Sequence, residues 1–93
     1  MRERDVERKI VKLAKDRGCL CWKLVCPGFV GVPDRIVIAP NGIVGFIEVK
    51  APGRTPTKKQ LYVINLLERF NVPVIWADDP EQAKQFIDEI CSI

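Results

Sequence analysis

The sequence contains no histidine. Histidine is the commonest general base in enzymes and the commonest metal-binding side chain, so catalysis or metal binding here must use other residue types. No apolar run approaches the roughly 18 residues of a membrane span, and the charged opening at residues 1–12 lacks the apolar stretch of a signal peptide. We therefore expect a soluble, cytoplasmic protein.

The sequence also lacks a CxxC pair, although it contains four cysteines. Hydrophobic residue types make up 47% of the chain, which is enough for an ordinary core, and we expect the thiols to stay reduced. A zinc site from Cys19, Cys21 and Cys26 is a weaker alternative because their spacing is not the usual zinc pattern. The missing CxxC likewise disfavours a redox protein.

The 93 residues leave room for one core, so we expect a single α/β domain over residues 1–93. The periodicity of apolar residues predicts the element order αβββαβα. Helices are expected at 3–17, around 61–70 and from Pro80 onward, and strands at 20–25, 35–39, 43–49 and 72–77. The predicted buried stripes of the helices are Val6, Ile10, Leu13 and Ala14; Leu61, Ile64, Leu67 and Phe70; and Ala83, Phe86, Ile87 and Ile90. This order predicts a mixed four-stranded sheet flanked by helices.

Two carboxylates and a lysine are the candidate catalytic residues. Glu48 and Lys50 lie two positions apart and therefore on one face of a strand, and Asp34 can supply the second carboxylate. Carboxylate oxygens suit Mg²⁺ or Mn²⁺, and a neighbouring lysine can orient water and stabilise charge on a phosphate. An exposed edge-strand pair is the alternative reading, but the apolar neighbours of Glu48 favour a central, buried strand.

Whether Asp34 reaches Glu48 depends on the turn between the second and third strands. A two-residue Asn41-Gly42 turn would pair Asp34 with Val49 and would leave the carboxylates on opposite faces. A three-residue turn that begins at Pro40, with its glycine in the left-handed conformation, pairs Asp34 with Glu48. We predict this second register, or an equivalent bulge.

Three segments together resemble the signature of the virus-type replication-repair nuclease (VRR-NUC) domain, a branch of the PD-(D/E)XK superfamily. They are Gly31-Val32-Pro33-Asp34-Arg35, Phe46-Ile47-Glu48-Val49-Lys50-Ala51-Pro52-Gly53, and Gln60. The resemblance extends over nearly the whole chain. It implies a restriction-endonuclease-like αβββαβ core and divalent-metal-dependent cleavage of DNA.

By position, the resemblance implies that Asp34 and Glu48 bind the metal, with the Val49 carbonyl as a further ligand. Lys50 would be the catalytic lysine, and Glu7 and Gln60 would complete the site. Glu7 borders the buried stripe of the first helix, while Glu3, one turn earlier, is the competing choice.

Gln60 has a structural alternative, because Thr57 and Gln60 have the spacing of a capping box. If Thr55 is instead the cap, with Pro56 at the first helical position, Gln60 is free to face the site. The Thr55-Pro56 pair favours this second arrangement.

A basic rim for DNA phosphates is expected around the proline- and glycine-containing loop. Its predicted members are Lys50, Arg54, Lys58, Lys59 and Arg35, and Lys23 matches a lysine of the family. A solvated charge cluster is the alternative, and the formal net charge of +3 does not decide between them.

The resemblance further implies a role in replication or repair on branched DNA, such as a Holliday junction or a flap. A homodimer would be required if two strands of a junction are cut. A stand-alone domain this short fits a phage or mobile element, in which case the host cytoplasm is the site of action. The competing function is a nucleic-acid-binding module of the same fold that does not cleave.

Overall fold

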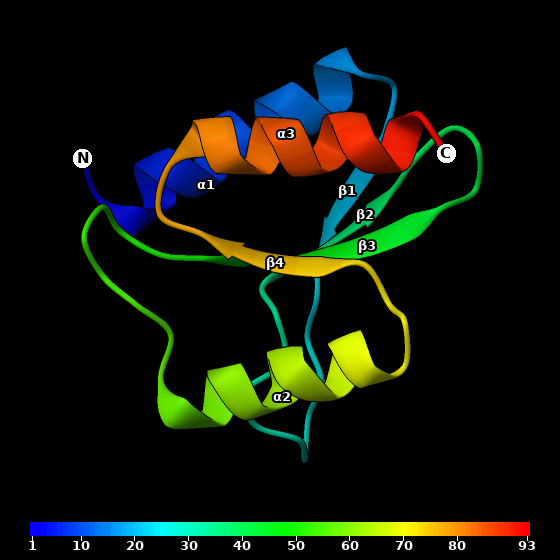
Figure 1. Cartoon of the computed structure of the whole chain (residues 1–93). Coiled ribbons are helices and arrows are strands. Elements are labelled where there is room, and N and C mark those ends of the chain that lie inside the picture. The colour runs from blue at the N-terminus through cyan, green and yellow to red at the C-terminus, as the bar shows by residue number, and fades with distance from the viewer.

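The computed structural model describes all of residues 1–93 and contains seven elements in the predicted order (Figure 1). The helices are α1 (Glu3–Asp16), α2 (Lys58–Arg69) and α3 (Pro80–Cys91), and the strands are β1 (Leu20–Lys23), β2 (Arg35–Ile38), β3 (Val44–Val49) and β4 (Val74–Ala77). β1 ends and β4 begins two residues inside the expected bounds. None of the helices is both long and apolar enough to cross a membrane.

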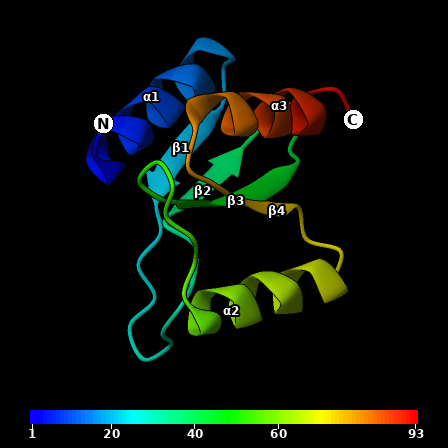
Figure 2. The same cartoon turned by 60° about the vertical axis from the view of Figure 1, so that its left-hand side comes forward.

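The four strands form one mixed sheet in the order β1-β2-β3-β4. β1, β2 and β3 pair antiparallel, and β4 pairs parallel to β3 across the connection through α2. α1 and α3 lie side by side on one face of the sheet, and α2 lies on the other (Figures 1 and 2). β3 is therefore an interior strand, as its apolar sequence predicted.

The hairpin between β2 and β3 has the predicted three-residue turn. Ile38 pairs with Val44, and the Ala39 amide then donates to the Ile43 carbonyl at 2.8 Å. Gly42 has φ +88, the left-handed conformation that such a turn requires. At the other end of the hairpin Arg35 pairs with Ile47, so the same register places Asp34 opposite Glu48.

The main core lies between the sheet and the pair α1 and α3. α1 contributes Val6, Ile10 and Ala14, which recur every four residues and are fully buried. The predicted stripe of α3 is buried as well, and its helix begins as expected, with Asp79 accepting a hydrogen bond from the Glu81 amide at 2.7 Å. Burying one large aliphatic side chain of this core contributes about 1.5–3 kcal/mol.

The prediction for the buried face of α2 is partly wrong. Leu61 and Phe70 are exposed, whereas Val63 and Ile64 are buried. α2 packs near the β4 edge, and its inward face includes Gln60, which bonds to the sheet. The buried face of α2 therefore includes the polar residue Gln60, which the spacing of apolar residues alone could not indicate.

Candidate active site

Glu48 is a charged side chain in the interior of the protein, with only 2% of its surface exposed. It lies near the end of the interior strand β3, between Ile47 and Val49, both fully buried. Burying an ionised carboxylate in such surroundings is costly unless partners compensate the charge. The edge-strand reading of this residue is therefore wrong, and its partners become the central question.

Two side chains contact the same oxygen of Glu48. The side-chain amide of Gln60 donates through Nε2 to Oε2 at 3.0 Å, and the Lys50 ammonium lies 3.4 Å from the same oxygen. The other oxygen, Oε1, is buried and has no hydrogen-bond partner in the chain. A buried carboxylate oxygen without a partner is rare in native proteins and calls for a ligand.

Asp34 brings the second carboxylate to the same place. Its Oδ2 accepts a hydrogen bond from the Val49 amide at 2.8 Å, which fixes the side chain against the end of β3. Burial, followed by the negative charge of Asp34, raises the pKa of Glu48 to about 7, and Lys50 offsets only part of this. Two carboxylates that repel each other in a partly buried site favour a bound cation.

The glycine of the Gly-x-Pro-Asp-Arg segment has a local structural reason. Gly31 has φ +99, and a Cβ at this position would lie 3.0 Å from the carbonyl oxygen of Lys59 in α2. Only glycine suits both the backbone conformation and the close approach. Asp34 is thus carried into the site by a loop that rests against α2.

Gln60 takes part in the site and in the helix cap at once. Its side-chain Nε2 donates to Glu48. Its side-chain Oε1 accepts from the backbone amide of Thr57 at 2.9 Å, and its own backbone amide donates to the Thr57 hydroxyl at 3.2 Å. The predicted cap at Thr55 is therefore wrong. The two ends of the amide serve separate partners, so the capping box does not exclude contact with Glu48.

The residues present fit a divalent cation of the Mg²⁺ type. Asp34 and Glu48 provide two carboxylates, and the unpartnered Oε1 of Glu48 is an oxygen of the kind that this cation prefers. No three Asp, Glu or Cys side chains converge on one point. Mg²⁺ usually takes one or two carboxylates together with water and substrate phosphate oxygens, so the two carboxylates of Asp34 and Glu48 match its usual number of protein ligands.

The two candidate glutamates of α1, Glu3 and Glu7, lie in different surroundings. Glu7 accepts a hydrogen bond from Arg35 at 2.8 Å and lies 3.8 Å from the Lys23 amine. Glu3 instead lines a cavity of about 530 Å³ together with Lys50. The structure thus places Glu3, the competing choice, in the same cavity as Lys50, and it places Arg35 against α1 rather than on the loop rim.

Comparison with known proteins gives the family. No family model matches the sequence. A protein of Acyrthosiphon pisum secondary endosymbiont phage 1, described as "Putative nuclease p44", is 46% identical over 61 residues, which span 66% of this chain and 66% of that protein. A solved structure described as a VRR_NUC domain superposes with a TM-score of 0.84 and 26% identity, over 92% of this chain and 94% of that one. The chain belongs to the VRR-NUC family.

In this VRR-NUC domain, the loop at residues 51–57 forms one wall of the cavity beside Lys50. Arg54 lines the cavity, and Lys58 and Lys59 are exposed at the start of α2. The Gly53 amide donates to Asp78 Oδ2 at 3.0 Å, and Gly53 has φ +82, so the loop is anchored to the end of β4. Of the predicted rim, Lys50 and Arg54 therefore line the cavity, while Lys58 and Lys59 are the first two residues of α2 and do not line it.

Asp78 is the residue of the VRR-NUC site region that sequence reasoning missed. Two adjacent acids, Asp78 and Asp79, precede Pro80, and only one of them can cap α3. The second acid is free for another partner, and here it holds the Gly53 amide. A surplus acid beside a cap was the available signal, but its distant partner was not visible in the sequence.

Proposed function

We propose that this VRR-NUC domain is a divalent-metal-dependent endodeoxyribonuclease whose active site is Asp34, Glu48 and Lys50. One observation carries the proposal: Glu48 is buried next to Asp34 while its Oε1 has no partner within the chain. Such a carboxylate is costly for a protein that does not use it. The family membership is consistent with phosphodiester hydrolysis.

Each residue of the site has a separate proposed role. Asp34 and Glu48 would hold Mg²⁺ or Mn²⁺, with the Val49 carbonyl as a third oxygen. Such a cation would make water acidic enough to act as a nucleophile at neutral pH and would neutralise charge on the phosphate. Gln60 fixes the position of Glu48, since its own amide is held by the cap at Thr57.

Lys50 is suited to act on the phosphate or on the attacking water. Its ammonium is anchored by Glu48 at 3.4 Å, and the side chain also lines the open cavity. A fixed cation at that place stabilises the negative charge that develops on a phosphate oxygen in the transition state. Glu3 lies in the same cavity and is a candidate for holding water there, a role for which Glu7, bound to Arg35, is less suited.

The substrate that we propose is branched DNA, such as a Holliday junction or a flap, in replication or repair. Arg54, which lines the cavity, and the exposed Lys58 and Lys59 at the start of α2 would bind phosphates on either side of the cut. One active site per domain means that cutting both strands of a junction takes two copies of the chain. We therefore propose a homodimer as the form that acts on junctions.

The test is cleavage of end-labelled four-way, flap and linear DNA by the purified protein with Mg²⁺ or Mn²⁺. Asp34→Asn and Lys50→Ala should each reduce cleavage by about 100-fold or more. Glu89→Gln, which removes an exposed carboxylate from α3, is the matched control and should cut normally. Binding without cleavage, on every substrate and with both metals, would instead support a non-cleaving module.

A further inference from the structure

α1 carries four cationic side chains along its solvent-facing side. Arg4, Arg8, Lys12 and Lys15 are separated by four, four and three residues, which is the spacing of one helix face. All four are exposed, and the buried residues of α1 lie on the opposite side. We call these four residues the α1 stripe. It shares no member with the predicted rim around the loop at residues 51–57.

The acidic residues of α1 do not neutralise most of the stripe. Asp5 accepts from the Arg2 amide, Glu7 from Arg35, and Glu3 lines the cavity beside Lys50. Asp16 pairs with one stripe member, Lys12, at 3.1 Å. No ion pair of the structure includes Arg4, Arg8 or Lys15, so three of the four charges are free for an external anion.

Helix stability does not account for the stripe. Arg4 stands in the first turn of α1, where the positive end of the helix dipole disfavours a cation. Lys15, in the last turn, is favourable there, but Arg8 has no such benefit. The arrangement keeps positive charge along the whole helix even where the helix itself would favour an acid.

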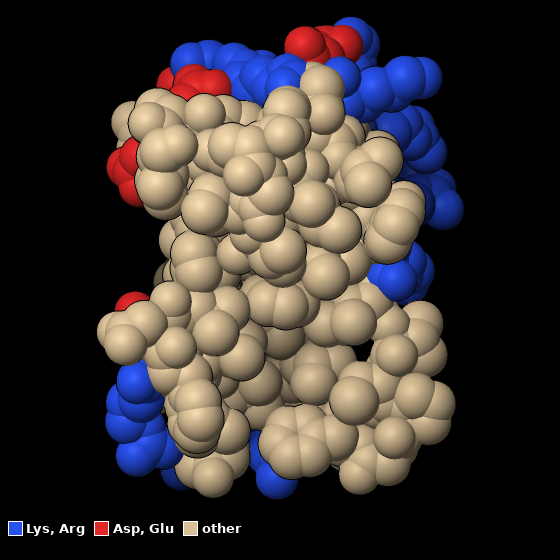
Figure 3. All heavy atoms as spheres, turned by 90° about the vertical axis from the view of Figure 1, so that its right-hand side faces the viewer, with Lys and Arg blue, Asp and Glu red and all other residues tan.

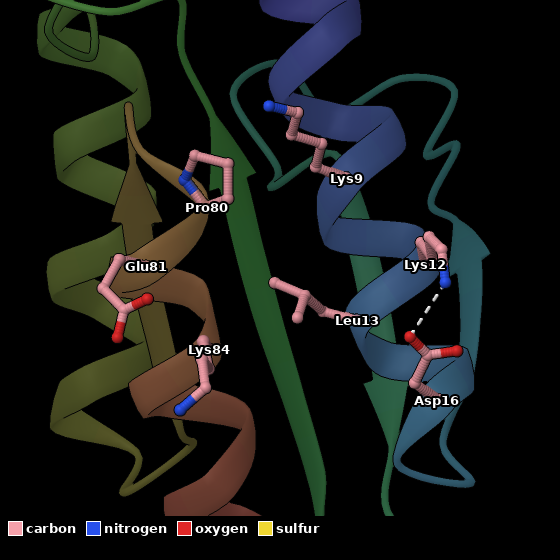
Figure 4. A pocket seen from close by; sticks show the side chains of 7 residues that line it. All are labelled: Lys9, Lys12, Leu13, Asp16, Pro80, Glu81 and Lys84. Carbon is pink, nitrogen blue, oxygen red and sulfur yellow. Dashed lines mark hydrogen bonds and ion pairs between the residues drawn. The ribbon is translucent and has the colours of Figure 1, made fainter.

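Further cations border the stripe on the side of α3. A groove of about 370 Å³ between α1 and α3 is lined by Lys9 and Lys84 together with the stripe member Lys12, and the acids Asp16 and Glu81 lie in the same groove (Figure 4). In Figure 3, lysines and arginines lie along the upper and right-hand edges of the molecule, with some acidic side chains among them, and a second group lies at the lower left. Lys9 and Lys84 therefore extend the positive charge of the stripe toward α3.

α1 begins at the active site and runs away from it. Glu3, its first residue, shares the cavity of Lys50, whereas an ion pair between Arg17 and Asp88 ties its far end to α3. Arg4 and Lys15 are eleven positions apart, which is about 17 Å along a helix. Duplex DNA rises about 3.4 Å per base pair, so this length matches roughly five base pairs.

We propose that the α1 stripe binds the sugar-phosphate backbone of duplex DNA leading into the active site, over about five base pairs from the cut. This rests on the proposed nuclease function and adds where the uncut part of the substrate lies. A duplex backbone presents regularly spaced negative charge along a line, which is what an extended row of cations complements. Contacts to phosphates carry no sequence information, so we expect binding at the stripe to be independent of sequence.

The experiment measures DNA binding by fluorescence anisotropy at several salt concentrations, in an Asp34→Asn background that blocks cleavage. Each phosphate contact contributes about 0.9 to the slope of log K against log salt. Arg8→Gln should therefore lower the slope by about 0.9, and the triple variant Arg4→Gln, Arg8→Gln, Lys15→Gln by about 2.7. Arg69→Gln is the matched control, because it removes one exposed, unpaired charge from the end of α2 and should leave the slope unchanged.

Flank length gives a second, independent readout. Affinity for a junction or flap should rise as its duplex arm grows from about 3 to about 6 base pairs and then level off, and the triple variant should lose this gain. The melting temperature of Arg4→Gln should equal or exceed that of the wild type, which separates lost binding from misfolding. The proposal would be contradicted if the triple variant kept the wild-type salt slope. It would also be contradicted if Arg69→Gln lowered the slope as much as Arg8→Gln does.

The outcomes also separate this inference from the proposed function. If the wild type cuts DNA and the triple variant keeps its slope and its flank dependence, the stripe alone is wrong. If the wild type neither binds nor cuts any DNA, the nuclease proposal and the stripe fall together.

Discussion

Glu48 and Asp34 repel each other in the site, and Lys50 offsets only part of this repulsion. Glu48→Gln keeps the shape of the side chain and removes one of the two charges. We expect this variant to be more stable than the wild type without metal, by about 1–3 kcal/mol at neutral pH, because the buried, unpartnered carboxylate is gone. Chemical denaturation in the presence of a chelator measures the difference.

The same variant should respond differently when metal is added. Mg²⁺ or Mn²⁺ should raise the unfolding free energy of the wild type, by about 2.7 kcal/mol at one hundred times the dissociation constant. Glu48→Gln should lose most of that gain. A variant that is less stable without metal, and equally stabilised by it, would contradict a cation site at these carboxylates.

The cysteines should differ sharply in reactivity. Burial, followed by the hydrogen bond with Cys91, raises the pKa of the Cys19 thiol to about 11, whereas Cys26 is exposed in the loop after β1. Alkylation requires the thiolate, and a raised pKa leaves almost none at pH 8. Iodoacetamide followed by mass spectrometry should show Cys26 modified at least about tenfold faster in the folded protein. Equal rates would mean that Cys19 is not buried.

At the scale of single elements, the first turn of α2 joins helix stability to the site. Thr57→Ala removes one half of the capping box and should cost about 1 kcal/mol of unfolding free energy, with cleavage close to normal. Gln60→Ala should cost a similar amount and in addition reduce cleavage by about tenfold, since Glu48 loses its amide donor. Equal activity of the two variants would show that Gln60 only caps the helix.

The hairpin is the element that the sequence predicted best. Pro40 and a glycine two residues later select a three-residue turn, and the register of Asp34 with Glu48 follows from that turn alone. The contacts that sequence reasoning missed join residues far apart in the chain. Arg35 meets Glu7, and Gly53 meets Asp78, through packing that no local spacing encodes.

α2 shows why local pattern is insufficient for a helix that packs on part of a sheet. Its apolar residues occupy more than one face, and tertiary contacts decide which of them is buried. The sheet beneath it carries a buried carboxylate, so the face with Gln60 turns inward and Leu61 stays outside. The contact of Gln60 with the site was predicted, but the capping box with Thr57 was treated as an alternative to that contact, whereas the structure contains both.

For the whole molecule, stability depends on the close packing of α3 against the sheet. A Cβ added to Gly45 in β3 would lie 2.8 Å from the ring of Phe86. Gly45→Ala should therefore lower the unfolding free energy by about 1–3 kcal/mol, through displacement of the aromatic ring in the core. Thermal or urea unfolding measures this effect. Recovery of stability in the double variant Gly45→Ala, Phe86→Leu would identify the ring as the cause, and normal stability of Gly45→Ala alone would contradict it.

The turn at residues 40–42 is fastened to the far end of the molecule, since the Asn41 amide donates to the Ile90 carbonyl of α3 at 2.9 Å. From Ala39 to Asp34 the strand runs about 17 Å, and strand pairing can change only by whole residues. A change in the turn would therefore shift Asp34 relative to Glu48 by whole residues and not gradually. A change in the length of this remote turn should therefore leave the two carboxylates either on the same face of the sheet or on opposite faces, with no intermediate arrangement.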